Sequence, residues 1–133
     1  MLEVIVLDSH IWFWWINREH HRLSAAMLDA IETTDRIGVS PVSCFELALA
    51  HQKGRLELSS TPAEWFSLAL HGSGVELLPF DDAIALRAVE LAKIHRDPFD
   101  RIIIATALES NGSLASVDSR FGAYPELTGI LLA

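Results

Sequence analysis

Short continuous apolar runs alternate along the chain with longer stretches in which apolar residues recur every three or four positions. The runs are typical of buried strands and the longer stretches of amphipathic helices. Strands are predicted at residues 3–8, 36–40, 75–80 and 113–118, with 129–133 as a fifth candidate. Helices are predicted at 9–17, 23–33, 43–53, 61–70, from 81 or 82 to about 94, and from 97 to 111. This alternation predicts an α/β fold with a mainly parallel central sheet of four to five strands flanked by helices.

Residues at the expected helix ends support these boundaries. Thr61-Pro62 and Asp97-Pro98 each combine a capping side chain with a proline suited to the first helical position. Gly54 follows the third predicted helix, where a glycine readily takes the left-handed conformation that ends a helix. The helices are therefore expected to begin and end close to these residues.

The composition fits one domain over residues 1–133. Half of the residues are apolar and 21% are charged, which is typical of a globular protein and argues against disorder. The single cysteine, Cys44, excludes an intramolecular disulfide framework. The apolar start contains Glu3 and Asp8, has no basic segment and is too short to span a bilayer, so we expect a cytoplasmic protein that does not enter the membrane.

The formal net charge of −8 argues against a general nucleic-acid-binding protein, which is usually basic. Four of the acids, however, lie where the chain changes from one kind of element to another. Asp8 and Asp118 end predicted strands, Glu46 lies in a predicted helix, and Asp100 opens another. In a parallel α/β fold such places gather at the carboxyl edge of the sheet. A divalent cation would remove the repulsion among acids gathered there and could hold a phosphate against them.

Each acid also has a purely structural explanation. Asp8 and Asp118 are equally suited to cap the segment that follows. Asp97 is expected to cap the helix that Asp100 opens, and Asp100 itself fits the third position of a capping box. A helical residue such as Glu46 ordinarily faces solvent, although its neighbours here are apolar. No acid taken singly decides between a structural and a functional role.

Together the acids and their neighbours resemble the PIN-domain ribonucleases, and among them the VapC-type toxins of bacterial toxin–antitoxin pairs. The resemblance covers nearly the full length in the order of the family, and its most specific part is the DPFDR block. The matching segments are VLDSH at 6–10, SPVSCFELA at 40–48, KGRL at 53–56, HRDPFDRIIIATA at 95–107 and LASVDSRF at 114–121.

The resemblance implies both the site and the activity. The implied function is a metal-dependent endoribonuclease that hydrolyses RNA phosphodiesters with Mg²⁺ (or Mn²⁺) and acts as the toxin of a toxin–antitoxin pair. Its partners would be RNA, a cognate antitoxin protein and a second copy of the chain in a homodimer. The metal-binding and catalytic acids would be Asp8, Glu46, Asp100 and Asp118, supported by the hydroxyls of Ser9 and Ser116.

Two basic residues near Asp100 are candidates for RNA or phosphate contact. Arg101 could reach a phosphate or pair with a carboxylate, and the two roles are equally open. His95 could meet RNA phosphate, although a structural role is the commoner one for such a histidine. Neither residue has a spacing that decides the matter.

Four consecutive aromatic residues, at 12–15, point about 100° apart on a helix, so one helix cannot bury all of them against its own core. We expect at least one to lie on the surface or in an interface, with Trp12, Trp14 and Trp15 as candidates for a partner surface. The alternative is that flanking helices enclose all of them within the monomer.

Two other functions compete with the nuclease. A PIN-like fold could be catalytically silent and serve only to bind a partner, but the presence of all four acids argues against this. An aspartate-nucleophile phosphohydrolase also places an Asp after its first strand, but it normally has a second Asp two residues later, where this chain has His10. Water is the expected nucleophile, since Cys44 has no evident base and no serine lies in a nucleophile elbow.

Overall fold

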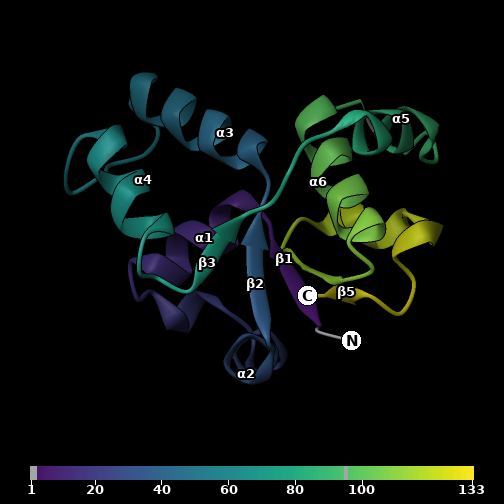
Figure 1. Ribbon diagram of the computed structural model, residues 1–133, viewed down its shortest axis with the longest axis horizontal. Helices are drawn as coiled ribbons and strands as arrows, with labels where there is room; N and C mark the ends of the chain where they lie inside the picture. Colours follow the sequence, from purple (N-terminus) through teal and green to yellow (C-terminus); the bar gives the residue numbers. More distant parts are fainter. Residues whose placement is uncertain (1–2, 95) are drawn as a thin grey trace.

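Five parallel strands form a central sheet in the computed structural model, which describes residues 3–94 and 96–133 (Figure 1). The order across the sheet is β3-β2-β1-β4-β5, and every neighbouring pair is parallel. This confirms the predicted fold class. The strands are β1 (Val4–Leu7), β2 (Arg36–Val39), β3 (Val75–Leu77), β4 (Ser113–Ala115) and β5 (Leu131–Leu132).

Six α-helices and three short 3₁₀ helices, η1 to η3, connect the strands in the described residues. The predicted caps occupy the predicted places. The Thr61 side chain accepts from the Glu64 amide at the start of α4, and the Asp97 carboxylate accepts from the Phe99 amide at the start of α6. The helices are α1 (Ser9–Ile16), α2 (Ala25–Thr33), α3 (Pro41–Gln52), α4 (Pro62–Leu70), α5 (Asp82–Glu90), α6 (Pro98–Glu109), η1 (His20–Arg22), η2 (Ser119–Ala123) and η3 (Pro125–Leu127).

Alternate side chains of β1 pack into cores on opposite faces of the sheet, as the two-residue period of a strand requires. Ile5 and Leu7 pack with residues of α1, α2 and α4, whereas Val6 packs with α6, η2 and η3. Helix α5 packs against α6 through a smaller cluster around Ile84. The sheet is thus covered on both faces, and β1 lies at its centre.

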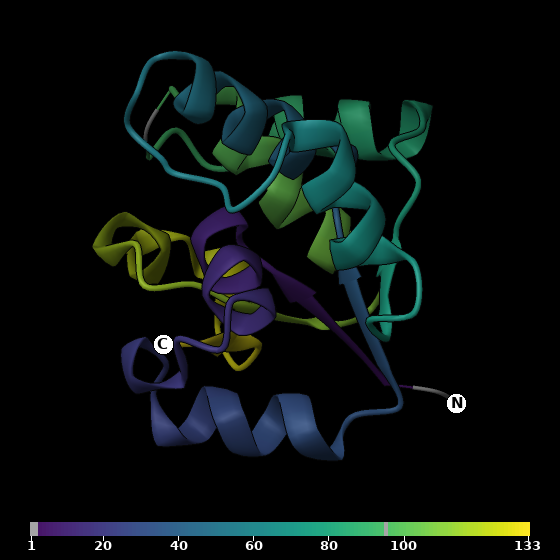
Figure 2. The ribbon, with the colours of Figure 1, turned by 90° about the vertical axis from the view of Figure 1, so that its left-hand side faces the viewer.

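The carboxyl ends of the strands point toward the space between α3 and α6 (Figure 1). Helix α2 lies beyond the opposite end of the strands, and a view turned by 90° shows it separated from the group formed by α3 to α6 (Figure 2). The loops that leave the carboxyl ends of the strands therefore lie on the side of the sheet where α3 and α6 begin. No helix in the described part of the chain has the length and apolar character needed to cross a membrane.

The strand predicted at 75–80 ends at Leu77. Two more predicted elements extend at least three residues too far, each for an identifiable reason. The strand predicted at 113–118 ends at Ala115, and Asp118 instead caps the 3₁₀ helix η2. The helix predicted to reach about residue 94 ends at Glu90, because the guanidinium of Arg101 binds the backbone carbonyls at its end. In these last two cases a side chain forms hydrogen bonds with backbone groups that a longer strand or helix would have used.

Candidate active site

Asp8 follows β1 directly and caps α1. One carboxylate oxygen, Oδ1, accepts from the Ser9 amide at 2.8 Å, and the other, Oδ2, accepts from the hydroxyl of Ser116 at 2.7 Å. The capping role and a place at the carboxyl edge of the sheet are therefore compatible. Ser116 is buried, and its oxygen also accepts from the Asp118 amide at 3.1 Å, so the loop after β4 fixes the orientation of Asp8.

Glu46 projects from the second turn of α3 and is half-buried. The hydroxyl of Ser9 donates to its Oε1 atom at 2.8 Å and shares a second hydrogen bond, of 2.9 Å, with the hydroxyl of Ser43. A hydroxyl has one hydrogen, so with Ser9 donating to the carboxylate Ser43 is the donor in the second bond. Ser43 was not predicted as a site residue; its position one helical turn before Glu46 was the available signal.

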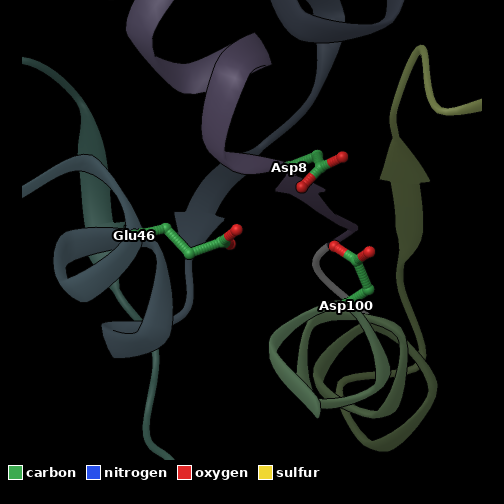
Figure 3. A group of neighbouring side chains, drawn as sticks. All are labelled: Asp8, Glu46 and Asp100. Atoms are coloured by element: carbon green, nitrogen blue, oxygen red, sulfur yellow. The ribbon is translucent and has the colours of Figure 1, made fainter. Parts of the chain in front are cut away.

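Asp100 lies in the first turn of α6 and is 7% exposed. Asp97 caps this helix, accepting from the amides of Phe99 and Asp100 at 2.9 and 3.5 Å. Asp97 therefore takes the capping role that the sequence also allowed for Asp100. The Asp100 carboxylate points toward Asp8 and Glu46 (Figure 3).

Asp8, Glu46 and Asp100 each offer a carboxylate oxygen to a group whose members all lie within 4.8 Å of one another. The three side chains come from the end of β1, from α3 and from α6, and their carboxylates face a common space (Figure 3). Three carboxyl groups so placed cannot all ionise without strong mutual repulsion.

The pKa values of these acids reflect that repulsion and their burial. Burial first, then the nearby carboxylates of Asp97, Asp8, Glu46 and Asp118, raise the pKa of Asp100 to about 8. Burial, together with the charges of Asp8 and Asp97, raises the pKa of Glu46 to about 7 despite the hydrogen bond from Ser9. Burial also raises the pKa of Asp8. A divalent cation bound through oxygen would offset this cost, and the donor set fits such an ion.

Asp118 lies at the margin of this group rather than within it. Its Oδ1 atom caps η2, accepting from the Arg120 amide at 2.9 Å, and its Oδ2 atom pairs with the Arg120 guanidinium at 2.7 Å. The same guanidinium lies 3.5 Å from Asp100 Oδ2. Of the four predicted acids, the structure brings three together and places the fourth beside them, close enough for its charge to raise the pKa of Asp8 and Asp100.

Arg120 was not predicted as a site residue. Its guanidinium bridges Asp118 and Asp100, and the carboxylate of Asp118 raises the pKa of Arg120. It brings a positive charge to the margin of an otherwise acidic site. A basic residue two positions after an expected catalytic acid was the only sequence signal.

For Arg101 the sequence left a phosphate contact and a carboxylate pair equally open, and in the structure its guanidinium binds backbone carbonyls. Its guanidinium donates to the carbonyls of Ala88, Val89, Leu91 and Ala92, at distances from 2.9 to 3.3 Å, and so ties the end of α5 to α6. This geometry supports a structural role in place of a phosphate contact. His95, the other predicted phosphate contact, lies outside the described residues.

Trp12 is fully buried, so its assignment to a partner surface was wrong. Its ring packs edge-on against Trp65 and stacks on Phe66, which means that α4 encloses it. Trp14 and Trp15 are only half-buried, as the helical periodicity required of some of these aromatic residues. Trp15 borders a groove of about 550 Å³ that Leu68 and other residues of the α1 and α4 ends also line.

Cys44 gives no sign of being a nucleophile. The side chain is half-buried, and burial raises the pKa of its thiol, which disfavours the reactive thiolate. No hydrogen bond joins the thiol to a base among residues 3–94 and 96–133. Attack by water therefore remains a prediction.

Comparisons with known proteins agree with the fold. The model of the PIN domain matches residues 5–127. The chain is 36% identical over 125 residues to Ribonuclease VapC22 of Mycobacterium tuberculosis, covering 92% of this chain and 93% of that protein.

Solved structures with the same fold include VapBC2 from Rickettsia felis bound to a DNA fragment from their promoter, with a TM-score of 0.69, 19% identity and 97% of each chain covered. DNA-bound VapBC from Salmonella typhimurium is similar with a TM-score of 0.63 at 20% identity, covering 99% of this chain and 98% of that one. The family match spans most of the sequence, over a range that contains the positions of all four predicted acids, and it confirms the resemblance to the family. This chain belongs to the PIN-domain family.

Proposed function

We propose that this protein is a metal-dependent endoribonuclease that acts in the cytoplasm as the toxin of a toxin–antitoxin pair. The observation that carries the proposal is the convergence of three carboxylates within 4.8 Å at the carboxyl edge of the sheet. The relative named Ribonuclease VapC22 supports an RNA phosphodiester as the bond that is cleaved.

In this proposal Asp8, Glu46 and Asp100 hold Mg²⁺ or Mn²⁺, with Asp118 contributing from the margin of the site. The bound metal would supply activation of the attacking water and stabilisation of negative charge on the phosphate and the leaving oxygen. Hard, oxygen-only ligands favour these ions over zinc, which more often takes nitrogen or sulfur donors.

The surrounding hydroxyls orient the acids. Ser116 holds one oxygen of Asp8, and Ser9 holds one oxygen of Glu46, so in each carboxylate a further oxygen lone pair remains for a ligand. These bonds fix side-chain rotamers before substrate arrives, which reduces the ordering that binding would otherwise require.

Hydrolysis by water is favoured over attack by a protein group. Both oxygens of Asp8 already accept hydrogen bonds, and the exposed His10 stands where an aspartate-nucleophile phosphohydrolase would need its second Asp. Cys44 is unsuited by its raised pKa. A catalytically silent PIN-like protein remains as the other outcome of the experiment below.

The proposed partners are a cognate antitoxin and a second copy of the chain. The solved relatives named above include VapBC complexes, and this supports an antitoxin here. The groove beside Trp15 and the strongly exposed Leu68 has a mixed lining, which also includes Arg18, and an antitoxin segment that enters it would bury the two apolar side chains. Ala substitution of Trp15 or Leu68 should weaken antitoxin binding; unchanged affinity would exclude this groove as the site.

The deciding experiment is RNA cleavage by the purified, antitoxin-free protein with and without Mg²⁺ or Mn²⁺. We expect cleavage that needs the metal and that falls to background in Asp8→Asn and Asp100→Asn, with both variants still folded by circular dichroism. Folded wild-type protein that leaves RNA intact with either ion would favour the silent partner-binding alternative.

A further inference from the structure

A groove of about 370 Å³ leads away from the acidic site along α3. Ser9, Glu46 and Asp97 line one end of it, and Lys53, Arg55 and Leu56 line the other. Figure 1 shows that α3 begins near α6 and runs outward from it, so the groove connects the acid cluster with the outer surface of the molecule. One end is negatively charged and the other positively charged.

Glu46 and Ala50 lie four residues apart on one face of α3, and Lys53, the C-cap residue, follows three residues later on the same side. Seven residues of helix span about 10 Å, so the Lys53 backbone lies about that distance along the axis from Glu46. The flexible side chain of Lys53 can shorten or lengthen this separation. Such a distance suits a contact with a phosphate that neighbours the reacting one in a polynucleotide.

The turn after α3 holds Lys53 and Arg55 in fixed backbone positions. The Arg55 amide donates to the Ala50 carbonyl at 2.9 Å and the Gly54 amide to the His51 carbonyl at 3.0 Å, which is the Schellman pattern. Gly54 has a φ of 72°, which glycine adopts without strain. The two basic side chains thus leave a rigid turn.

Both basic side chains are exposed, and neither forms an ion pair within residues 3–94 and 96–133. By contrast, Arg36 pairs with Glu76 and Arg120 pairs with Asp118. In a chain with a net charge of −8, two such cations on a groove that also reaches the acidic site suit an anionic ligand.

Aromatic rings lie at the acidic end of the same groove. His10 and Phe99 both line it, and the Phe99 ring lies 5.2 Å from that of Phe45, which is 55% exposed. Exposed rings beside a charged track are typical of proteins that stack the bases of a single strand. This favours single-stranded RNA over a duplex, whose bases are stacked on one another.

We propose that Lys53 and Arg55 bind the RNA strand at phosphates that flank the scissile one, so that the substrate lies along α3. This inference rests on the proposed RNA cleavage and names the path of the substrate. Lys53 and Arg55 are positioning residues: they hold the strand while the acids act on one phosphate.

The test compares Lys53→Gln/Arg55→Gln with Arg87→Gln/Lys93→Gln, which removes the same charge on and just after α5. Binding of a labelled, mixed-sequence single-stranded RNA is measured by fluorescence anisotropy over a range of salt, in an Asp100→Asn background that prevents cleavage. Each lost phosphate contact lowers the salt slope of log Kd by about 0.7 for a single strand, so we expect a fall of about 1.4 in the first variant only.

A second measurement uses proteins that retain Asp100 and can therefore cleave RNA. Lys53→Gln/Arg55→Gln should raise KM for RNA and leave kcat unchanged, because it weakens binding of substrate and transition state alike. If Lys53 merely complements the negative end of α3, the variant would instead lower the melting temperature and keep the salt slope, and the proposal would be wrong.

Other outcomes also decide. Equal salt slopes of log Kd in the two double variants would mean that only net charge matters. Loss of antitoxin binding with unchanged RNA binding would assign the groove to a protein partner. Either result overturns the proposal. Wild-type cleavage is measured separately. If wild-type protein cleaves RNA but the groove variant behaves like wild type, the inference fails and the proposed function stands. If wild-type protein neither binds nor cleaves RNA, both fail.

Discussion

Ser9 and Ser116 each donate a hydrogen bond to one of the clustered acids, to Glu46 at 2.8 Å and to Asp8 at 2.7 Å. Ser9→Ala and Ser116→Ala should each lower RNA cleavage by about 10- to 100-fold, the usual loss when a group that orients a metal ligand is removed. Initial cleavage rates at saturating Mg²⁺ would measure the effect. Thr at either position keeps a hydroxyl and should retain more activity than Ala.

Ser24→Ala is a control for stability. Ser24 caps α2, where its side chain accepts from the Met27 amide at 3.1 Å, and α2 lies at the opposite end of the strands from the acids (Figure 2). Its loss should cost about 1 kcal/mol of unfolding free energy without lowering cleavage. If Ser24→Ala lowers cleavage as much as Ser9→Ala, the proposed orienting role of Ser9 is wrong.

The sequence predicted the position of some residues at the site but not the contacts that others make. Asp8 was predictable because an acid directly after a buried strand must lie at the edge of the sheet. The partners of Arg101 and Arg120 were not, since these depend on how α5 meets α6 and on how the loop after β4 folds back toward Asp100. Those contacts are tertiary, and no local pattern encodes them.

At the scale of elements, Gly112 joins α6 to β4 at a point where the chain passes very close to β1. A Cβ atom at Gly112 would lie 2.5 Å from the carbonyl oxygen of Val4, a backbone atom that cannot move without disturbing the central strand. Gly112→Ala should therefore lower the free energy of unfolding by about 1–3 kcal/mol. Urea titration of the two proteins would measure the difference.

Gly122→Ala is the matched control, because a Cβ atom at Gly122 would meet no atom within 4 Å. We expect its unfolding free energy to stay close to that of wild type. Equal destabilisation by both substitutions would show that loss of glycine flexibility, and not the approach to β1, governs the effect at Gly112.

Elements with strong local signals were predicted closely, and elements limited by tertiary contacts were not. The start of α6 at Pro98 followed from Asp97-Pro98, and the end of α3 followed from Gly54. The early end of α5 could not be foreseen, because it depends on the Arg101 guanidinium, which comes from the next helix.

At the scale of the whole molecule, the acid cluster should make the stability of the metal-free protein depend on pH. The pKa of Glu46 rises from 4.5 to about 7 and that of Asp100 from 3.8 to about 8 on folding, chiefly through burial. The folded protein therefore binds protons more tightly than the unfolded chain. The resulting stabilisation is complete below about pH 4 and is lost as the pH rises through about 7 to 8.

Thermal melts in EDTA should consequently show a melting temperature that falls between pH 5 and pH 8, the range over which Glu46 and Asp100 lose their protons. Mg²⁺ should raise the melting temperature at pH 8 and have little effect at pH 5, because it binds the ionised carboxylates of the folded state.

Other acids also titrate, so the decisive comparison is with Glu46→Gln/Asp100→Asn. This variant should be at least as stable as wild type at pH 8 without metal, since it removes two buried charges that repel one another and Asp8. It should also lose most of the pH dependence and the response to Mg²⁺. A variant whose melting temperature follows the wild-type pH profile would mean that the two carboxyl groups do not carry the effect, and an equal Mg²⁺ shift in both proteins would place the metal elsewhere.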